Sequence, residues 1–267
     1  MEQKARERAE KWTRAPYDQE TQQQARQLMD QGGDALIDAF YQDLDFGTGG
    51  LRGIMGVGTN RVNRYTLGLA TQGLANYLEQ QRPGKKHRVA IAFDSRNNSK
   101  KFASEIADVL AANGAEVFLF EDLRPTPELS FAIRHLSCDA GIVITASHNP
   151  PEYNGYKVYW NDGGQLVPPH DRGVIAEVRK VTPEAVKYGG SESLIHLIGE
   201  ELDQAYTDEL IKQCLTNDGK QDLKVVFTPI HGTSITAMPG AMEAAGFSDV
   251  HIVEEQATPD GNFPTVE

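Results

Sequence analysis

Two patterns of hydrophobic residues, continuous apolar runs and apolar residues at helical spacing, alternate along most of the chain. Short apolar runs predict strands, and each is followed by a longer segment in which apolar residues recur at helical spacing. The runs lie at 87–93, 115–121, 139–145 and 156–160, and the longer segments lie at 65–81, 99–114, 126–136 and 170–181. This alternation predicts an α/β fold with a mixed, mostly parallel sheet and helices on both faces.

A helical segment is predicted before this pattern, over residues 1–45. Its apolar residues recur at roughly helical spacing, namely Leu28, Met29, Leu36, Ile37 and Phe40. We expect two helices broken near Gly32 and Gly33, packed against a first domain at 46–182. Residues 183–198 lose periodicity and are predicted to be a linker.

The order strand, loop, helix, glycine, strand occurs twice, starting at Arg88 and at Lys224. We therefore expect a second domain at 199–267, built like the first. In the first copy a third, very apolar strand follows, whereas the second copy reaches Glu267 before any such strand. An unpaired sheet edge is unfavourable, so we expect the second domain to be incomplete and the chain to be truncated.

Charge narrows the range of partners. Lys and Arg number 26 and Asp and Glu 38, a net charge of −12. An acidic surface repels nucleic acid and anionic lipid, so we expect neither as a partner. The two distant cysteines favour a reducing compartment, and the charged N-terminus has no apolar signal region. These features predict a cytoplasmic location.

Candidate chemistry gathers in loops after the predicted strands, where open α/β sheets bind ligands. DSRNN contains Asp94 and Arg96, LRPTPE follows the second strand, and TASHNPP contains Ser147. The glycine-rich segment 46–61 could join them. It is either a flexible loop or an anion site, because the Arg52 guanidinium and free N–H groups can all donate to an anion.

Ser147 itself admits two interpretations: a catalytic group or a polar residue in a turn. Neither a G-x-S-x-G elbow nor a Walker phosphate loop is present. Adjacent side chains of an extended chain point opposite ways, so His148 is poorly placed as its base. Pro150 and Pro151 stiffen the loop, and Lys157 follows closely, which favours function.

Four ordered stretches resemble motifs of the α-D-phosphohexomutases, the phosphoglucomutase and phosphomannomutase superfamily. They are FGTGGLRG (46–53), TASHNP (145–150), NGYK (154–157) and TPIHGT (228–233). The resemblance covers residues 40–267, and the preceding helices resemble the phosphoglucomutase-2/phosphopentomutase branch.

This resemblance implies an intramolecular phosphotransferase that interconverts sugar 1-phosphate and sugar 6-phosphate, of glucose or mannose, through a phosphoserine and a sugar bisphosphate. Ser147 would carry the phosphoryl group, His148 and Lys157 would flank it, and Arg52 would stabilise charge. Substrate or phosphate contacts are implied for Thr48, Gly49, Asp94, Arg96 and Asn149. The implied ligands are a small phosphosugar, a sugar 1,6-bisphosphate activator and Mg²⁺.

Three alternatives stay open. One is a phosphopentomutase or sugar-bisphosphate synthase on the same scaffold, and another is a phosphoserine-dependent phosphatase. The third is a non-catalytic fragment that binds sugar phosphate. The sequence does not choose among glucose, mannose, glucosamine and pentose phosphates.

The resemblance also implies a magnesium site of which this chain holds only one ligand, a phosphate oxygen on Ser147. The family's D-x-D-x-D-R run does not occur up to Glu267, and a turn explains Asp260 in ATPDGN. Mg²⁺ prefers several oxygen ligands in octahedral geometry. We therefore expect this 267-residue chain to bind Mg²⁺ only weakly and to show no mutase activity.

Calorimetric titration with Mg²⁺ checks this expectation. Saturable binding at micromolar Mg²⁺ would show that a complete site exists within these residues.

Overall fold

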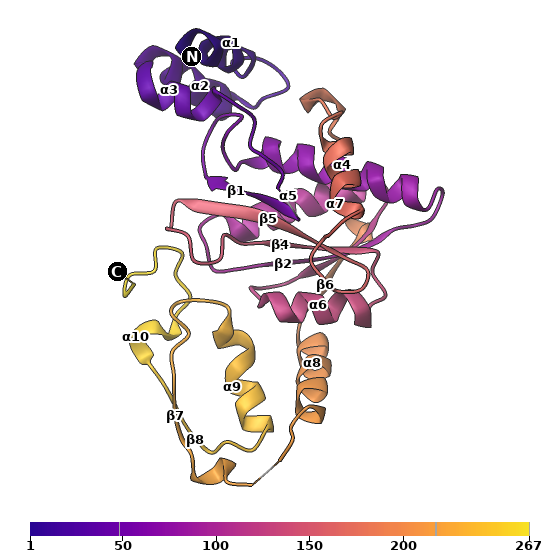
Figure 1. The fold of residues 1–267 in the computed structure, drawn as a ribbon, viewed down its shortest axis with the longest axis vertical. Coiled ribbons are helices and arrows are strands. Elements are labelled where there is room, and N and C mark those ends of the chain that lie inside the picture. The colour runs from indigo at the N-terminus through magenta and orange to yellow at the C-terminus, as the bar shows by residue number, and fades with distance from the viewer. Residues whose placement is uncertain (48, 217, 267) are drawn as a thin grey trace.

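The computed structural model describes residues 1–47, 49–216 and 218–266. Thr48, one of the predicted phosphate-binding residues, lies outside the described residues. Figure 1 shows an N-terminal helical segment above a large α/β domain and a smaller unit below it. No helix of the described ranges is both long and apolar enough to cross a membrane.

A six-stranded sheet forms the centre of the large domain, in the order β1-β5-β4-β2-β3-β6. Strands β4, β2, β3 and β6 are parallel, whereas β5 is antiparallel to both β4 and β1. The strands are β1 Gly50–Ile54, β2 Arg88–Phe93, β3 Glu116–Phe120, β4 Ala140–Ile144, β5 Tyr153–Trp160 and β6 Ile195–Ile198. The prediction of a mixed, mostly parallel sheet is confirmed.

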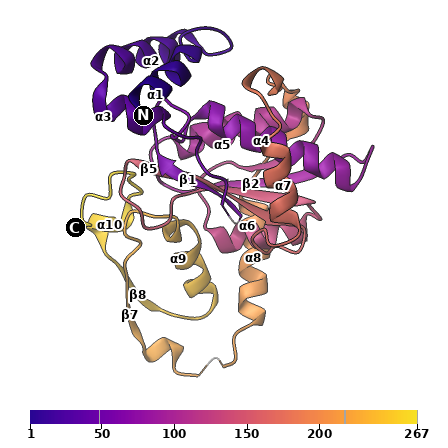
Figure 2. The same cartoon turned by 45° about the horizontal axis from the view of Figure 1, so that its top comes forward.

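Helices cover both faces of this sheet (Figures 1 and 2). One face packs against α4 Arg64–Gln81, α5 Ser99–Ala112 and α7 His170–Val178, and the other against α6 Thr126–His135 and α8 Glu200–Lys212. Successive side chains of a strand point to opposite faces, so Ile142 and Val143 of β4 belong to different cores. Every residue of β4 is buried, as its uninterrupted apolar sequence predicts.

Two of the strands fall where the sequence predicts none. The glycine-rich segment contains β1, which can approach β5 because Gly50 has no side chain. A Cβ there would lie 2.0 Å from the carbonyl oxygen of Tyr156. The predicted linker contains β6, an edge strand whose Leu197 is 68% exposed. Such an edge need not show the alternation by which strands are recognised.

Three helices make up the N-terminal segment: α1 Glu2–Lys11, α2 Gln19–Gln31 and α3 Gly33–Phe40. The predicted break at Gly32 is present, and a second break precedes α2. Trp12, Tyr17 and Phe40 pack with Tyr65 of α4. The Tyr65 hydroxyl also donates to the Asp18 carboxylate and accepts from the Asp18 N–H, both at 2.7 Å. The segment therefore packs on the α/β domain, as expected.

The smaller unit contains β7 Lys224–Phe227, α9 Ser234–Ala244, β8 Asp249–Ile252 and α10 Glu254–Ala257. Strands β7 and β8 pair in parallel across α9, which repeats the arrangement of β2, α5 and β3. The predicted repeat of elements is therefore present. Short 3₁₀ turns occupy Pro183–Ala185, Glu192–Leu194 and Lys220–Asp222.

Helix α8, which leads to the smaller unit, is fastened to the domain by Arg124. The Arg124 guanidinium donates to both carboxylate oxygens of Asp203 on α8, at 2.8 and 2.7 Å. Glu128 of α6 lies 4.0 Å from Arg124 Nε and is 1% exposed. Burial, reinforced by the nearby Asp203 carboxylate, raises the pKa of Glu128 to about 8.

This raised pKa predicts a pH-dependent stability. Between the ordinary pKa of 4.5 and about 8, the folded state keeps a proton that the unfolded state releases. The contribution of Glu128 is therefore complete below the lower value and is lost as pH rises, at about 1.4 kcal/mol per pH unit. Glu128→Gln should remove this slope. Urea unfolding at several pH values from about 5 to about 8 measures the slope.

Glu192→Gln, at an exposed carboxylate, is the matched control and should keep the wild-type slope. Parallel stability curves for Glu128→Gln and the wild type would contradict the assignment.

Candidate active site

The loops after β2 and β4 meet at the carboxyl edge of the sheet. These strands are neighbours, and the Asp94 N–H donates to the Ile144 carbonyl at 3.1 Å. Together with the smaller unit they enclose a cavity of about 700 Å³, a size typical of small-molecule sites. The lining residues that the sequence predicts are Asp94, Arg96, Ser147, His148, Asn149 and Lys157.

Ser147 occupies an exposed, tightly turned position in this cavity. Its φ of +56° lies in the left-handed region, which side chains other than glycine seldom adopt. The Ser147 N–H donates to Thr145 Oγ1 at 3.0 Å, and the Asn149 N–H donates to the Ala146 carbonyl at 3.2 Å. A positive φ at a residue other than glycine indicates a backbone held in place by its surroundings.

Arg96 supplies much of that restraint. Its guanidinium donates to the carbonyl oxygens of Ser147, Asn149, Pro150 and Tyr153, at 2.7, 2.5, 2.8 and 3.1 Å. The side chain is 1% exposed. A phosphate contact is predicted for Arg96, and in the structure both terminal nitrogens of its guanidinium are hydrogen-bonded to the loop backbone.

Asp94 also organises the loop. Its Oδ1 accepts from the Ser99 hydroxyl at 2.7 Å and from the Arg96 N–H at 3.0 Å. Burial raises the pKa of this carboxyl, and the hydrogen bonds, including one with Thr145, oppose the rise. Asp94 and Arg96 therefore bind protein groups, and the predicted ligand contacts of both stay predictions.

Two cations reach the site from neighbouring strands. Arg52 on β1 stands opposite Gly155, and Lys157 on β5 stands opposite Gly50. The Arg52 guanidinium donates to Asn149 Oδ1 at 2.8 Å, which links β1 to the serine loop. Burial lowers the pKa of Lys157, and the charge of Arg52 lowers it further. The arrangement concentrates positive charge beside Ser147 in a protein of net charge −12.

Gly49, predicted to contact phosphate, lines a smaller hollow of about 240 Å³ together with Arg52 and Lys157. Its φ is +83°, and a Cβ would lie 2.8 Å from Gln165 Nε2. A side chain there would fill the approach to the two cations. His148 is exposed and lines the main cavity.

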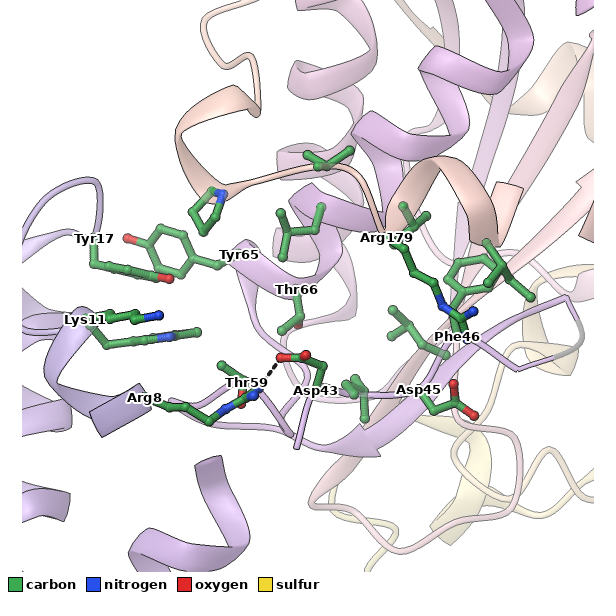
Figure 3. A pocket seen from close by; sticks show the side chains of 18 residues that line it. Arg8, Lys11, Tyr17, Asp43, Asp45, Phe46, Thr59, Tyr65, Thr66 and Arg179 are labelled. Carbon is green, nitrogen blue, oxygen red and sulfur yellow. Dashed lines mark hydrogen bonds and ion pairs between the residues drawn. The ribbon is translucent and has the colours of Figure 1, made fainter. Parts of the chain in front are cut away.

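Another cavity, of about 660 Å³, lies where the N-terminal segment meets the domain (Figure 3). Tyr17 and Lys11 line one side and Arg179 the other, and Arg8 pairs with Asp43. It adjoins the Gly49 hollow, because Asp45 and Leu51 line both. The helices before the domain therefore border the glycine-rich segment.

The donor atoms near Ser147 do not fit a magnesium site. The parts of the chain that the structure describes contain no group of three or more His, Cys, Asp or Glu residues able to hold a metal ion. Asp94 is engaged with protein donors. Asp260 accepts from the Asn262 N–H at 2.8 Å, the turn that the sequence predicts for it.

Arg124 and Phe263 are among the residues that line the cavity but are absent from the sequence-based prediction of the site. Arg124 follows β3 and lies in LRPTPE, one of the three loops expected to bind a ligand, so its position in the sequence could have identified it. Phe263 comes from the smaller unit and lines the same cavity. Its contact with the site depends on how two units pack, which no local pattern reveals.

Comparison with known proteins places this geometry in a family. The family model for phosphoglucomutase/phosphomannomutase alpha/beta/alpha domain I matches residues 43–185, and that for domain II matches residues 204–267. Mouse phosphopentomutase is 37% identical over 270 residues, covering 96% of this chain and 44% of that protein. A phosphoglucomutase of Staphylococcus saprophyticus is 38% identical over 229 residues, covering 84% and 41%.

Solved structures agree. A protein of Thermus thermophilus assigned as a phosphomannomutase superposes with a TM-score of 0.70 at 26% identity, covering 85% of this chain and 48% of that one. The chain spans less than half the length of these relatives. The match to domain I alone covers more than half of the 267 residues, so the chain belongs to the phosphoglucomutase/phosphomannomutase family.

Proposed function

We propose that the complete protein is a phosphosugar mutase in which Ser147 carries the phosphoryl group. The observation that supports this most is the serine held at positive φ at the carboxyl edge of the sheet, with Arg52 and Lys157 on the adjoining strands. In phosphoryl transfer the protein contributes mainly alignment and charge stabilisation, which this arrangement can supply.

In the proposed reaction a sugar hydroxyl attacks the phosphorus of phosphorylated Ser147. The new P–O bond forms as the bond to Ser147 Oγ breaks, and the proton that the sugar hydroxyl loses is balanced by the one that Ser147 Oγ gains. Arg52 and Lys157 balance the charge that develops on the equatorial oxygens. The resulting sugar bisphosphate then returns its other phosphoryl group to Ser147 by the reverse step.

The substrate is proposed as a class, a sugar monophosphate. The relatives include both a phosphopentomutase and a phosphoglucomutase at nearly equal identity. Glucose 1-phosphate and ribose 1-phosphate, assayed in parallel on the complete protein, separate the hexose from the pentose alternative. Magnesium and a sugar 1,6-bisphosphate activator belong to the same proposal, with most of the metal's ligands supplied from elsewhere than the residues around Ser147.

Ser147→Ala in the complete protein should abolish most mutase turnover, because this variant lacks the hydroxyl that carries the phosphoryl group in the proposed reaction. Coupled assay of sugar 6-phosphate formation measures turnover, and mass spectrometry of the peptide containing residue 147 reports its phosphorylation. Ser95→Ala, in the neighbouring loop, is a control for folding by circular dichroism. Near-normal turnover of Ser147→Ala would rule out the proposed carrier.

Replacing Arg52 or Lys157 with Met should lower kcat by roughly tenfold to a thousandfold, the range for losing one contact to transition-state charge. Both side chains border cavities rather than the packed core, so thermal unfolding should change little. Steady-state kinetics and calorimetry on the same samples check the two expectations. A collapse of the melting temperature with unchanged kcat in the surviving protein would make these residues structural.

A further inference from the structure

We propose that Phe263, in the smaller unit, is a positioning residue for the serine loop and acts on it through Arg96. The inference rests on the proposed function for its catalytic meaning. Its structural basis is a continuous set of contacts that runs from His231 to Ser147.

The contact nearest to the serine is the guanidinium of Arg96. It is bonded to four carbonyl oxygens between Ser147 and Tyr153, and it therefore fixes the path of that loop. Its only close carboxylate among the described residues is Asp94, with Nε 3.5 Å from Oδ2. The position of this one cation consequently sets the position of the loop backbone.

Phe263 covers the guanidinium. The Arg96 Cζ lies 5.0 Å from the centroid of the Phe263 ring, within the range of a cation–π interaction. The planar guanidinium is bonded along its edge to the loop, so an aromatic ring can still contact its face. Phe263 thus contributes attraction, and its bulk limits access of water to the hydrogen bonds beneath it.

Polar contacts hold the Phe263 loop against the Arg96 loop. The Asn97 side-chain amide donates to Asn262 Oδ1 at 3.0 Å. A Cβ on Gly261 would lie 2.5 Å from the Asn97 backbone nitrogen, so the close approach requires glycine. These two contacts set which residue of the smaller unit faces Arg96.

His231 organises the loop from inside the smaller unit. It is 3% exposed, and its ring nitrogens contact the Thr258 carbonyl at 3.1 Å and Thr265 Oγ1 at 3.0 Å. Its backbone N–H donates to the Gln256 carbonyl, and its own carbonyl accepts from the Asp260 N–H. His231 lies in the TPIHGT stretch, which the proposed chemistry leaves without a role, and these contacts place it as the anchor of residues 256–265.

The serine loop of the first domain therefore depends on a residue of the second unit. Displacement of that unit would withdraw the ring from Arg96 and loosen the turn that presents Ser147. Such a dependence couples the geometry of the phosphoryl carrier to the placement of the second domain.

Hydrogen exchange of residues 145–153 tests the contact in the 267-residue chain, without any need for activity. In Phe263→Leu we expect these amides to exchange about 2- to 30-fold faster, the span that corresponds to a lost cation–π contact. Phe263→Tyr keeps the aromatic face and should restore protection. Val226→Ala removes an exposed apolar side chain of the same unit and should change nothing.

Arg96→Lys keeps the positive charge but removes the planar guanidinium. It therefore separates the effect of the charge from that of the four hydrogen bonds, because an ammonium cannot donate to four carbonyls in one plane. We expect exchange at least as fast as in Phe263→Leu. Unchanged exchange in Phe263→Leu, or equal acceleration in Val226→Ala, would overturn the proposal.

Kinetics of the complete protein supply the functional test. Phe263→Leu should lower kcat about 2- to 30-fold with KM nearly unchanged, and Phe263→Tyr should restore kcat. If altered exchange were accompanied by unaltered kcat, the positioning role would be overturned. If the wild type lacked mutase activity, the proposed function would be wrong. The exchange results would still show whether the contact between Phe263 and Arg96 stabilises the serine loop.

Discussion

A single buried cation, Arg96, determines the geometry of the site. A guanidinium removed from water must be surrounded by hydrogen-bond acceptors, since an unpaired buried charge is strongly unfavourable. Here the acceptors are mainly backbone carbonyls of the serine loop rather than a carboxylate. The same loop conformation places four carbonyl oxygens around the guanidinium and Ser147 at positive φ, so burial of Arg96 and presentation of the serine are linked.

The surrounding sheet supplies what this constraint requires. Parallel β2 and β4 end side by side, which brings the Arg96 loop and the serine loop together. Antiparallel β5 and β1 then return the chain past the same edge, and their side chains add Arg52 and Lys157. The two cations stay close despite mutual repulsion because strand pairing fixes their backbones. Burial lowers the pKa of Lys157, and repulsion by Arg52 adds to this effect.

Sequence patterns predicted the elements whose residues are all buried. Strand β4 is buried on both faces, so its composition alone identified it, and the loop that follows was recognised from its prolines and motif. Strand β1 was missed because the glycines that let it approach β5 are also typical of loops. Edge strand β6 was missed because half of it faces solvent.

The predictions for individual side chains divide in the same way. Ser147 and Lys157 line the main cavity, and Arg52 lines the smaller hollow that it shares with Lys157. The sequence motifs identified all three residues, although strand β1, which contains Arg52, was not predicted. The engagement of Arg96 with carbonyls and the contact of Phe263 with Arg96 depend on the folded path of two loops from different units. The sequence shows that Arg96 is a cation, but only the folded structure shows which hydrogen-bond acceptors surround it.

The pairing of β1 with β5 also bears on the order in which the protein can form during synthesis. Arg52 and its partner Asn149 are separated by 97 residues, and within the described sheet β1 has no other neighbouring strand. The glycine-rich segment must therefore wait, unpaired, while the chain that forms β2 through β4 leaves the ribosome. Chains emerge at about 5–20 residues per second, so this interval lasts on the order of seconds. The many glycines and the charge of Arg52 make the unpaired segment a poor template for wrong strand pairing.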